Sequence, residues 1–306
     1  MKCAATQQKS AVIIKYNLGF PAAYAAAAMR EQPLGDSSHY PLGYSEQEAR
    51  RLAAQGALLE EYTAELLRRA GLRPGMQVLD VGCGVGDVSL LAARMVGFDG
   101  SVLGIDRAAT SIDTARRRAA SAGAKNVEFM EADITSFETD RLFDALIGRL
   151  VLLYVPNPGA AVRRLCRHLN PGALVAFQEY DLPQFSQSPP SEFFARIQSY
   201  ILEAFAAGGA ELNMGTKLYS TFVRAGLPPP QMISGSPVGC GTHWPGYEYM
   251  AGVVGSLLPL MERTGIATAQ LIDVDTLADR LRNDSTANER VGFLPRIVGA
   301  WARIAE

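Results

Sequence analysis

Apolar and polar positions follow two alternating periods over residues 45–182. Short apolar runs bounded by glycine, proline or charged residues predict five strands. These predicted strands cover residues 77–81, 101–105, 127–130, 143–148 and 173–179. Segments with helical spacing of their apolar residues predict helices at 45–71, 88–96, 111–123 and 158–168. Strands that alternate with helices in this way predict an α/β fold with a parallel, doubly wound sheet and right-handed crossovers.

The pattern changes after Asp181. Prolines predict a loop there, and the segments that follow favour helices at 192–207 and 214–225 and a strand at 231–238. Residues 246–283 predict two further helices, and 291–302 predict a last strand. Pro295 is awkward inside that strand, because proline cannot donate to a sheet and suits only an edge or a bulge.

Ser45 and Glu48 match a capping box at the start of the first helix. With 306 residues, 48% of them hydrophobic, and no low-complexity linker, the chain is expected to form one large core with added helices rather than two independent domains. Basic clusters such as Arg50-Arg51 and Arg163-Arg164 are interpreted as solvated helix faces, and His168 as a surface residue.

Charge and cysteine usage narrow the class of protein. A net charge of -2 and a pI near 6.0 tell against nucleic acid as a partner. The four cysteines and three histidines show no metal-ligand spacing, so no structural metal is expected. Scattered cysteines indicate a reducing compartment, and the first residues lack an apolar run long enough for a membrane span or a secretory signal. These features predict a cytoplasmic protein.

The most informative segment is Val78-Leu79-Asp80-Val81-Gly82-Cys83-Gly84-Val85-Gly86-Asp87. An apolar strand enters a glycine-rich turn that opens a helix, and such a turn lets a ligand approach the backbone at the carboxyl edge of a parallel sheet. The second strand ends in Asp106, roughly twenty residues on, where a carboxylate meets a ribose diol. The third strand ends in Glu131-Ala132-Asp133-Ile134.

In this order the motifs resemble those of the class I S-adenosylmethionine-dependent methyltransferases, and the resemblance runs from about Met76 to Asp181. It implies a Rossmann-like sheet of seven strands in the order 3-2-1-4-5-7-6, with the last two strands antiparallel at the edge. It also implies a helical N-terminal extension (1–44), a cofactor-binding core (45–182) and a C-terminal half (183–306) that carries a helical lid at about 241–288.

The resemblance implies a set of cofactor contacts. Gly82, Gly84 and Gly86 would pass under the methionine and ribose, with Asp80 orienting the turn and the ammonium. Asp106 would bind the ribose hydroxyls and Asp133 the adenine amine. Further residues expected to line the cofactor are Ile134, Arg107 or Ala108, Arg149, Tyr44 and Gln55. A site edged by three aspartates suits the cationic S-adenosylmethionine better than a pyrophosphate.

Catalytic candidates are fewer. His243, beside Trp244 at the start of the expected lid, could remove a proton from the acceptor, or it could be an ordinary loop histidine. Arg149 ends the fourth strand and could bind an acceptor carboxylate or phosphate, or the methionine carboxylate; pairing with Glu179 or Asp181 is favoured slightly. Glu179 is a further candidate. Tyr154, Tyr180 and Asp181 also stand at strand ends, and Tyr40 lies near the first helix.

The acceptor is expected to be a small, partly apolar or aromatic molecule. The fourth strand is followed by Leu150-Val151-Leu152-Leu153-Tyr154, which lacks the N/D-P-P-Y/F pattern of enzymes that methylate bases or glutamine side chains. The expected lid is rich in leucine, methionine and aromatic residues, which either line a binding site or pack between helices. O-, N- and C-methylation stay open, as does the choice between a monomer and a homodimer.

Two alternatives belong to other classes. A non-catalytic protein could bind S-adenosylmethionine in a regulatory role, because these motifs report binding rather than turnover. An NAD-dependent oxidoreductase would also use Asp106, but it calls for G-x-G-x-x-G where this chain has G-x-G-x-G.

Overall fold

A computed structural model describes residues 41–43 and 46–305, and all of them belong to one compact unit that spans residues 38–306. The capping residue Ser45, the cofactor candidate Tyr44, Tyr40 and nearly all of the expected N-terminal extension lie outside the described residues.

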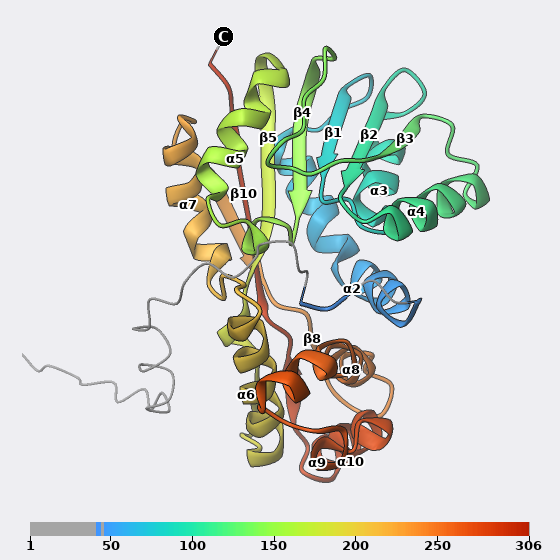
Figure 1. The fold of residues 1–306 in the computed structure, drawn as a ribbon, viewed down its shortest axis with the longest axis vertical. Helices are drawn as coiled ribbons and strands as arrows, with labels where there is room; N and C mark the ends of the chain where they lie inside the picture. Colours follow the sequence, from blue (N-terminus) through green and yellow to red (C-terminus); the bar gives the residue numbers. More distant parts are fainter. Residues whose placement is uncertain (1–40, 44–45, 306) are drawn as a thin grey trace, which may run out of the picture. The chain divides into compact units, whose positions relative to one another are not determined.

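The main sheet has seven strands in the order β3-β2-β1-β4-β5-β10-β7 (Figure 1). Its strands are β1 (Gln77–Val81), β2 (Ser101–Asp106), β3 (Val127–Glu131), β4 (Phe143–Arg149), β5 (Leu169–Asp181), β7 (Gln231–Gly235) and β10 (Arg296–Arg303). The five strands from β3 to β5 in this order run parallel to one another, whereas β10 is antiparallel to both β5 and β7. Counted among themselves in chain order, these strands have the order 3-2-1-4-5-7-6, which confirms the predicted fold class.

Helices cover both faces of this sheet. They are α2 (Glu46–Ala70), α3 (Asp87–Val96), α4 (Ala109–Ser121), α5 (Pro158–Leu165) and α7 (Met214–Ala225). Alternate residues of each strand point to opposite faces. Val78 packs in one core cluster with α3 and the C-terminal half of α2, while Leu79 packs in another with residues of α5 and α7. The sequence at the start of α5 favours a helix. Pro158 occupies the first turn, and the side chain of the N-cap residue Asn157 accepts a hydrogen bond from Ala160 N at 3.1 Å.

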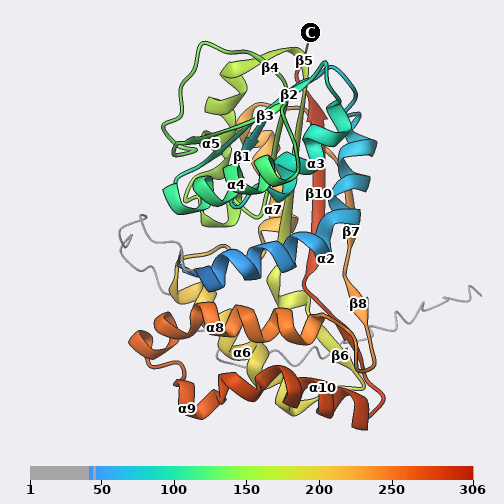
Figure 2. The same cartoon turned by 90° about the vertical axis from the view of Figure 1, so that its right-hand side faces the viewer.

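A second group of helices lies beyond the carboxyl ends of the parallel strands (Figures 1 and 2). It comprises α6 (Glu192–Ala207), α8 (Gly246–Thr264), α9 (Ala269–Ile272) and α10 (Leu277–Ala287). Helix α8 packs against α2, α6 and α10, so α2 runs between the sheet and this helical group (Figure 2). The structure therefore has three helices where two were predicted for residues 246–283.

A small antiparallel sheet, β6-β9-β8, accompanies these helices and was not predicted. Its strands are β6 (Ser186–Ser188), β8 (Val238–Gly239) and β9 (Val291–Phe293). Two segments that were each predicted to form one strand are divided between the main sheet and this small sheet. Residues 231–238 do not form one strand, and the run 291–302 breaks at Leu294-Pro295, where proline has no N–H to donate to either sheet.

Two surface assignments from the sequence are wrong. His168 is only 5% exposed. It lies in a 3-10 turn (Cys166–His168) after α5, with Phe137 edge-on to its ring and Glu138 Oε2 3.3 Å from its Nε2. Arg51 is 6% exposed and forms an ion pair with Glu48 at 2.6 Å. A cluster of arginines in the sequence therefore does not show that every residue of the cluster is exposed to solvent.

Candidate functional site

The glycine turn lies between the end of β1 and the start of α3, at the carboxyl edge of the sheet. Gly82, Gly84 and Gly86 all have positive φ angles, of 65°, 53° and 89°. Cys83 N donates to Ile105 O at 2.9 Å, which ties the turn to β2. The first turn of α3 therefore opens directly above the strand ends, as the sequence predicts.

Each glycine leaves room for a different neighbour. A Cβ on Gly82 would come within 2.4 Å of Val151 Cγ2, and a Cβ on Gly86 would lie 3.0 Å from the Phe129 ring. A Cβ on Gly84 would meet only Leu52 Cδ1, at 3.9 Å. Gly82 and Gly86 thus permit close packing within the protein, whereas Gly84 keeps a space open above the turn. That space is where a cofactor would contact the backbone.

Gly84→Ala tests this assignment. The left-handed φ costs a side chain about 1 kcal/mol, and the new methyl group enters the open space. We expect the affinity for S-adenosylmethionine to fall by roughly tenfold or more. Gly123→Ala is the matched control, because Gly123 has a φ of 65° and no atom within 4 Å of its Cβ position. Titration calorimetry and thermal unfolding of both variants separate the two effects; equal affinities in both variants would contradict the assignment.

Asp106 joins two segments of the site through its carboxylate. Oδ2 accepts a hydrogen bond from Gly84 N and Oδ1 accepts one from Ala108 N, both at 2.9 Å. Burial raises the pKa of Asp106, and these two hydrogen bonds oppose the rise. The carboxylate therefore sits beside the glycine turn with lone pairs remaining for a ribose diol.

The expected adenine contacts lie in the neighbouring loop. Ala132 N donates to Asp106 O at 2.9 Å, so the loop after β3 lies beside the end of β2. Asp133 is half-buried, and its Oδ1 accepts hydrogen bonds from Thr135 N (2.7 Å) and Thr135 Oγ1 (2.5 Å). Ile134 packs against the core, and Arg107 is half-buried beside Asp106. The structure brings these residues to the same edge as Gly84.

Asp80 is buried under the turn, with 1% exposure. Its Oδ2 accepts a hydrogen bond from Ser89 Oγ at 2.5 Å, while its Oδ1 has no hydrogen-bond partner in the described structure. Burial raises the pKa of Asp80 to about 7, and the positive charge of Arg149 is one of the influences that oppose the rise. An orphaned carboxylate oxygen of this kind fits a site that receives a cation.

The raised pKa of Asp80 predicts that cofactor affinity depends on pH. A bound sulfonium and ammonium favour the ionised carboxylate, so binding below about pH 7 must release a proton. We expect S-adenosylmethionine to bind more tightly as the pH rises toward about 7, with little change above it, whereas uncharged adenosine should not show this increase. Calorimetry in buffers of different ionisation enthalpy measures the proton release; an affinity for S-adenosylmethionine that is flat from pH 5.5 to 8.5 would contradict this assignment.

Glu179 is fully buried and holds the chain segment that follows β4. Its Oε1 accepts hydrogen bonds from Val151 N at 3.0 Å and Leu152 N at 2.7 Å, and its Oε2 has no hydrogen-bond partner among the described residues. Burial raises the pKa of Glu179 to about 8 despite these backbone hydrogen bonds. Because Val151 packs against Gly82, the Glu179 carboxylate helps to fix the position of the glycine turn through Val151.

Arg149 does not make the pairing that the sequence favoured. Its Nη1 donates to Thr63 Oγ1 at 2.9 Å, and neither Glu179 nor Asp181 forms an ion pair with it. Asp181 instead binds Arg296, at 2.5 Å, from the neighbouring strand β10. Arg149 and Asp181 therefore each bind a residue that lies far away in the sequence, and the positions of the strand ends could not identify these partners.

A polar cluster links the sheet edge to α8. Gln55, on α2, donates from Nε2 to the Tyr249 hydroxyl at 2.9 Å. Burial raises the pKa of Tyr180 well above its usual value, and the nearby Tyr249 raises it further. Sequence reasoning found Gln55 but missed Tyr249 and Thr63 as members of this cluster. An aromatic residue and a threonine on amphipathic helices look like ordinary core residues, so no local signal marked them.

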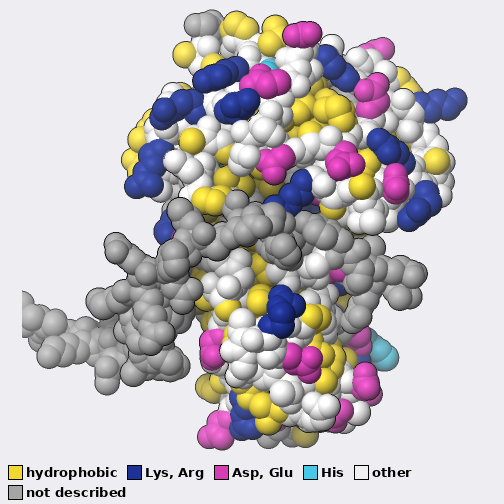
Figure 3. Space-filling model, viewed as in Figure 1, with side chains coloured by type: hydrophobic (Ala, Val, Ile, Leu, Met, Phe, Trp, Pro, Cys, Tyr) yellow, Lys and Arg dark blue, Asp and Glu magenta, His cyan; other side chains and the backbone are white. Residues whose placement is uncertain are grey.

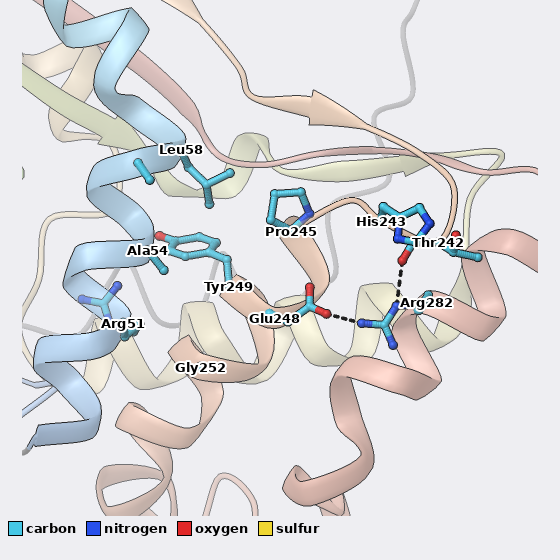
Figure 4. A pocket seen from close by; sticks show the side chains of 11 residues that line it. Arg51, Ala54, Leu58, Thr242, His243, Pro245, Glu248, Tyr249, Gly252 and Arg282 are labelled. Carbon is cyan, nitrogen blue, oxygen red and sulfur yellow. Dashed lines mark hydrogen bonds and ion pairs between the residues drawn. The ribbon is translucent and has the colours of Figure 1, made fainter.

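His243 lies in an exposed loop that lines a pocket of about 920 Å³ (Figure 4). The pocket lies between α2, the loop before α8, α8 and α10, with Tyr249 directed toward Ala54. Arg282 spans one side, where its Nε donates to Thr242 O at 3.0 Å and its Nη2 forms an ion pair with Glu248. Neither Arg149 nor Glu179 lines this pocket, so the three catalytic candidates do not share it.

The pocket and the glycine turn lie on different faces of α2. Arg51, Ala54 and Leu58 line the pocket, and their spacing places them along one side of the helix. Leu52, on another side, is the residue nearest to the Gly84 Cβ position. Helix α2 therefore separates the pocket that His243 lines from the glycine turn.

Among the described residues, no group of three or more His, Cys, Asp or Glu residues is arranged to hold a metal ion. No helix in this part of the chain is long and apolar enough to cross a membrane.

Known proteins are similar to this chain over about half of its length. A family model described as methyltransferase domain matches residues 72–226. Phosphoethanolamine N-methyltransferase 3 of Arabidopsis thaliana is 34% identical over 155 residues, which are 50% of this chain and 31% of that protein. The 2-phytyl-1,4-naphtoquinone methyltransferase of Trichormus variabilis is 30% identical over 164 residues, 53% of this chain and 68% of that protein. The chain spans only 26% to 31% of the length of its plant relatives.

Solved structures show the same fold. The YcgJ protein from Bacillus subtilis has a TM-score of 0.55 at 16% identity, over 80% of this chain and 99% of that one. Phosphoethanolamine N-methyltransferase 2 of Haemonchus contortus, solved with S-adenosylhomocysteine, has a TM-score of 0.51 at 17% identity, over 80% of this chain and 53% of that one. The family match covers half of the chain and includes the whole glycine turn, and it supports neither of the two alternatives. The chain belongs to the class I S-adenosylmethionine-dependent methyltransferases.

Proposed function

We propose that this protein transfers the methyl group of S-adenosylmethionine to a small acceptor molecule. The observation that carries the proposal is the open space above Gly84 beside the Asp106 carboxylate, at the end of the strand that carries Asp80. When bound, the cofactor supplies an electrophilic methyl group. The protein's part is to hold the cofactor and to align the acceptor for in-line displacement, which supplies much of the acceleration.

The acceptor proposed is partly apolar or aromatic. The cluster at the sheet edge includes Tyr180 and Tyr249, which are both less than 10% exposed. Relatives named for aklanonic acid and for 2-phytyl-1,4-naphtoquinone support a ring-containing acceptor, whereas those named for phosphoethanolamine support a small amine. O-, N- and C-methylation all remain candidates.

The segment 241–288 is proposed to cover the bound acceptor. Helix α8, within it, is joined to α2 by the hydrogen bond between Gln55 and Tyr249. His243 stays a candidate base only if this segment moves, because it lines a pocket on the other side of α2. Arg149 is proposed as a binding residue, and Glu179 as a residue that positions the turn after β4 rather than one that contacts the acceptor.

We also propose a cytoplasmic location and an acceptor other than nucleic acid. Cys83, Cys166 and Cys240 are free thiols, in keeping with a reducing compartment. Basic and acidic side chains are intermixed over the described residues of the face in Figure 3, which does not favour a nucleic-acid backbone. We propose a homodimer as one possible state, and the molar mass in solution, measured by light scattering, distinguishes it from a monomer.

A transfer assay tests the proposed function. The protein is incubated with methyl-labelled S-adenosylmethionine and a panel of phenols, quinols, amines and carboxylic acids. We expect label in at least one product, together with S-adenosylhomocysteine. Binding of S-adenosylmethionine without transfer to any class would favour the non-catalytic alternative. Asp106→Ala controls for background methylation.

A further inference from the structure

Three buried polar side chains meet where α2, α8 and the end of β5 come together. They are Gln55, Tyr180 and Tyr249, each no more than 8% exposed. Tyr249 reaches from α8 toward α2 (Figure 4), where Gln55 Nε2 donates a hydrogen bond to its hydroxyl at 2.9 Å. The Tyr180 hydroxyl is hydrogen-bonded to both Gln55 and Tyr249. Polar groups withdrawn from water in this way are costly unless each donor finds an acceptor.

The hydrogen bonds among these three side chains leave one phenolic proton without an acceptor. The amide of Gln55 has two N–H groups, which serve the two phenols. One hydroxyl proton joins the phenols to each other. That proton belongs to Tyr180, because burial and the neighbouring Tyr249 both raise the pKa of Tyr180 well above its usual value. The Tyr249 oxygen therefore accepts two hydrogen bonds, and its own proton meets no acceptor among the described residues.

The charge next to this cluster of Gln55, Tyr180 and Tyr249 is positive. Arg149, at the end of β4, interacts electrostatically with both phenols, and the Thr63 hydroxyl accepts a hydrogen bond from its Nη1 at 2.9 Å. An ammonium group on a ligand would meet this positive charge and would find no carboxylate within the cluster. An oxygen atom has lone pairs that can accept the Tyr249 proton. The cluster therefore favours an oxygen atom of a ligand over a charged nitrogen.

We propose that the Tyr249 hydroxyl donates a hydrogen bond to an oxygen atom of the methyl acceptor, so that the protein selects phenols, enols or quinols over amines. This inference rests on the proposed function, and it names the acceptor class that the proposed function leaves open. Tyr249 belongs to the segment proposed to cover the acceptor, and Tyr180 lies one residue before the end of β5. The donor therefore lies between the expected lid and the carboxyl edge of the sheet.

Calorimetric titration of the complex with S-adenosylhomocysteine tests this donor, with 1-naphthol and 1-naphthylamine as probes of nearly equal size. The aromatic amine is a weak hydrogen-bond acceptor, because its lone pair is shared with the ring. We expect 1-naphthol to bind about tenfold more tightly than 1-naphthylamine, and Tyr249→Phe to remove this preference. Tyr249→Phe should bind S-adenosylhomocysteine as the wild type does, because the change removes a contact to the acceptor alone.

Tyr247→Phe is the matched control. Tyr247 lies two residues earlier on α8 and is buried, and its hydroxyl has no hydrogen-bond partner in the described structure. Two residues turn a helix by about 200°, so Tyr247 faces away from the cluster, and it packs edge-on against Trp244. The control variant therefore loses a buried phenol hydroxyl from the same helix and keeps the preference for 1-naphthol.

The ratio of the two affinities in the wild-type protein is informative even if Tyr249→Phe fails to fold. Equal affinities for the two probes, no binding of 1-naphthol, or a preference that survives in Tyr249→Phe would overturn the inference. In the transfer assay, label in amines and none in phenols or quinols would overturn it as well. Failure of the wild-type protein to bind S-adenosylhomocysteine would instead refute the proposed function itself.

Discussion

Asp106→Ala is expected to weaken S-adenosylmethionine binding by about a hundredfold. The change removes the carboxylate proposed to bind the ribose, and hydrogen bonds to a charged group are worth roughly 1.5–3 kcal/mol each. It also removes the acceptor for Gly84 N and Ala108 N, so the glycine turn loses a bond that fixes it to the end of β2. Calorimetric titration of the purified variant measures the loss, and Asp106→Asn, which keeps one carbonyl oxygen, is expected to be intermediate.

Asp144→Ala is the matched control for this substitution. Asp144 accepts hydrogen bonds from Gln77 N and Asn170 Nδ2, both at 2.9 Å, at the amino end of the parallel strands. It resembles Asp106 in tying two segments together, but it lies away from the glycine turn. We expect Asp144→Ala to lower stability and keep cofactor affinity. If both alanine variants bind S-adenosylmethionine as the wild type does, the role of Asp106 is refuted.

Glu179→Ala is expected to destabilise the protein by about 2–4 kcal/mol, because it leaves the buried N–H groups of Val151 and Leu152 without an acceptor. Glu179→Gln keeps an acceptor oxygen in nearly the same shape, so it should lose much less stability at neutral pH. Urea unfolding followed by circular dichroism gives both free energies. A Glu179→Ala variant within about 0.5 kcal/mol of wild type would contradict this structural role.

The same residue predicts how the free energy of unfolding depends on pH. The pKa of Glu179 is raised to about 8 in the folded state, whereas the unfolded chain releases this proton near the ordinary glutamate pKa of 4.5. The folded state therefore binds more protons in this window, and the free energy of unfolding falls as the pH rises through it. Asp80 adds a fall in the same direction up to about pH 7. Glu179→Gln should make the dependence shallower; an unchanged slope would show that Glu179 is already ionised.

Much of the sheet could be predicted because its strands are short apolar runs separated by clear breaks. Burial on both faces explains why β1 and β4 are nearly continuous in hydrophobic residues. The strands β6, β8 and β9 could not be found in this way. They are two or three residues long and consist largely of Ser, Gln and Gly, so no alternation of apolar and polar positions marks them.

The cofactor side of the site was easier to predict than the acceptor side. The positions of Asp80, Gly84 and Asp106 are fixed by the turn and by the strand ends. The order of these residues in the sequence therefore predicts that they lie close together in the fold. Arg149 and Tyr249 depend instead on how α2 and α8 pack over the sheet. Contacts such as the hydrogen bond between Gln55 and Tyr249 join residues 194 positions apart, and no local pattern reports them.

The most direct test of the account is a calorimetric titration of the wild-type protein with S-adenosylmethionine, S-adenosylhomocysteine and NAD. The glycine turn, the Asp106 carboxylate and the buried Asp80 predict that the first two bind and that NAD does not. Binding of NAD alone, or of none of the three, would contradict the assignment of this site to S-adenosylmethionine.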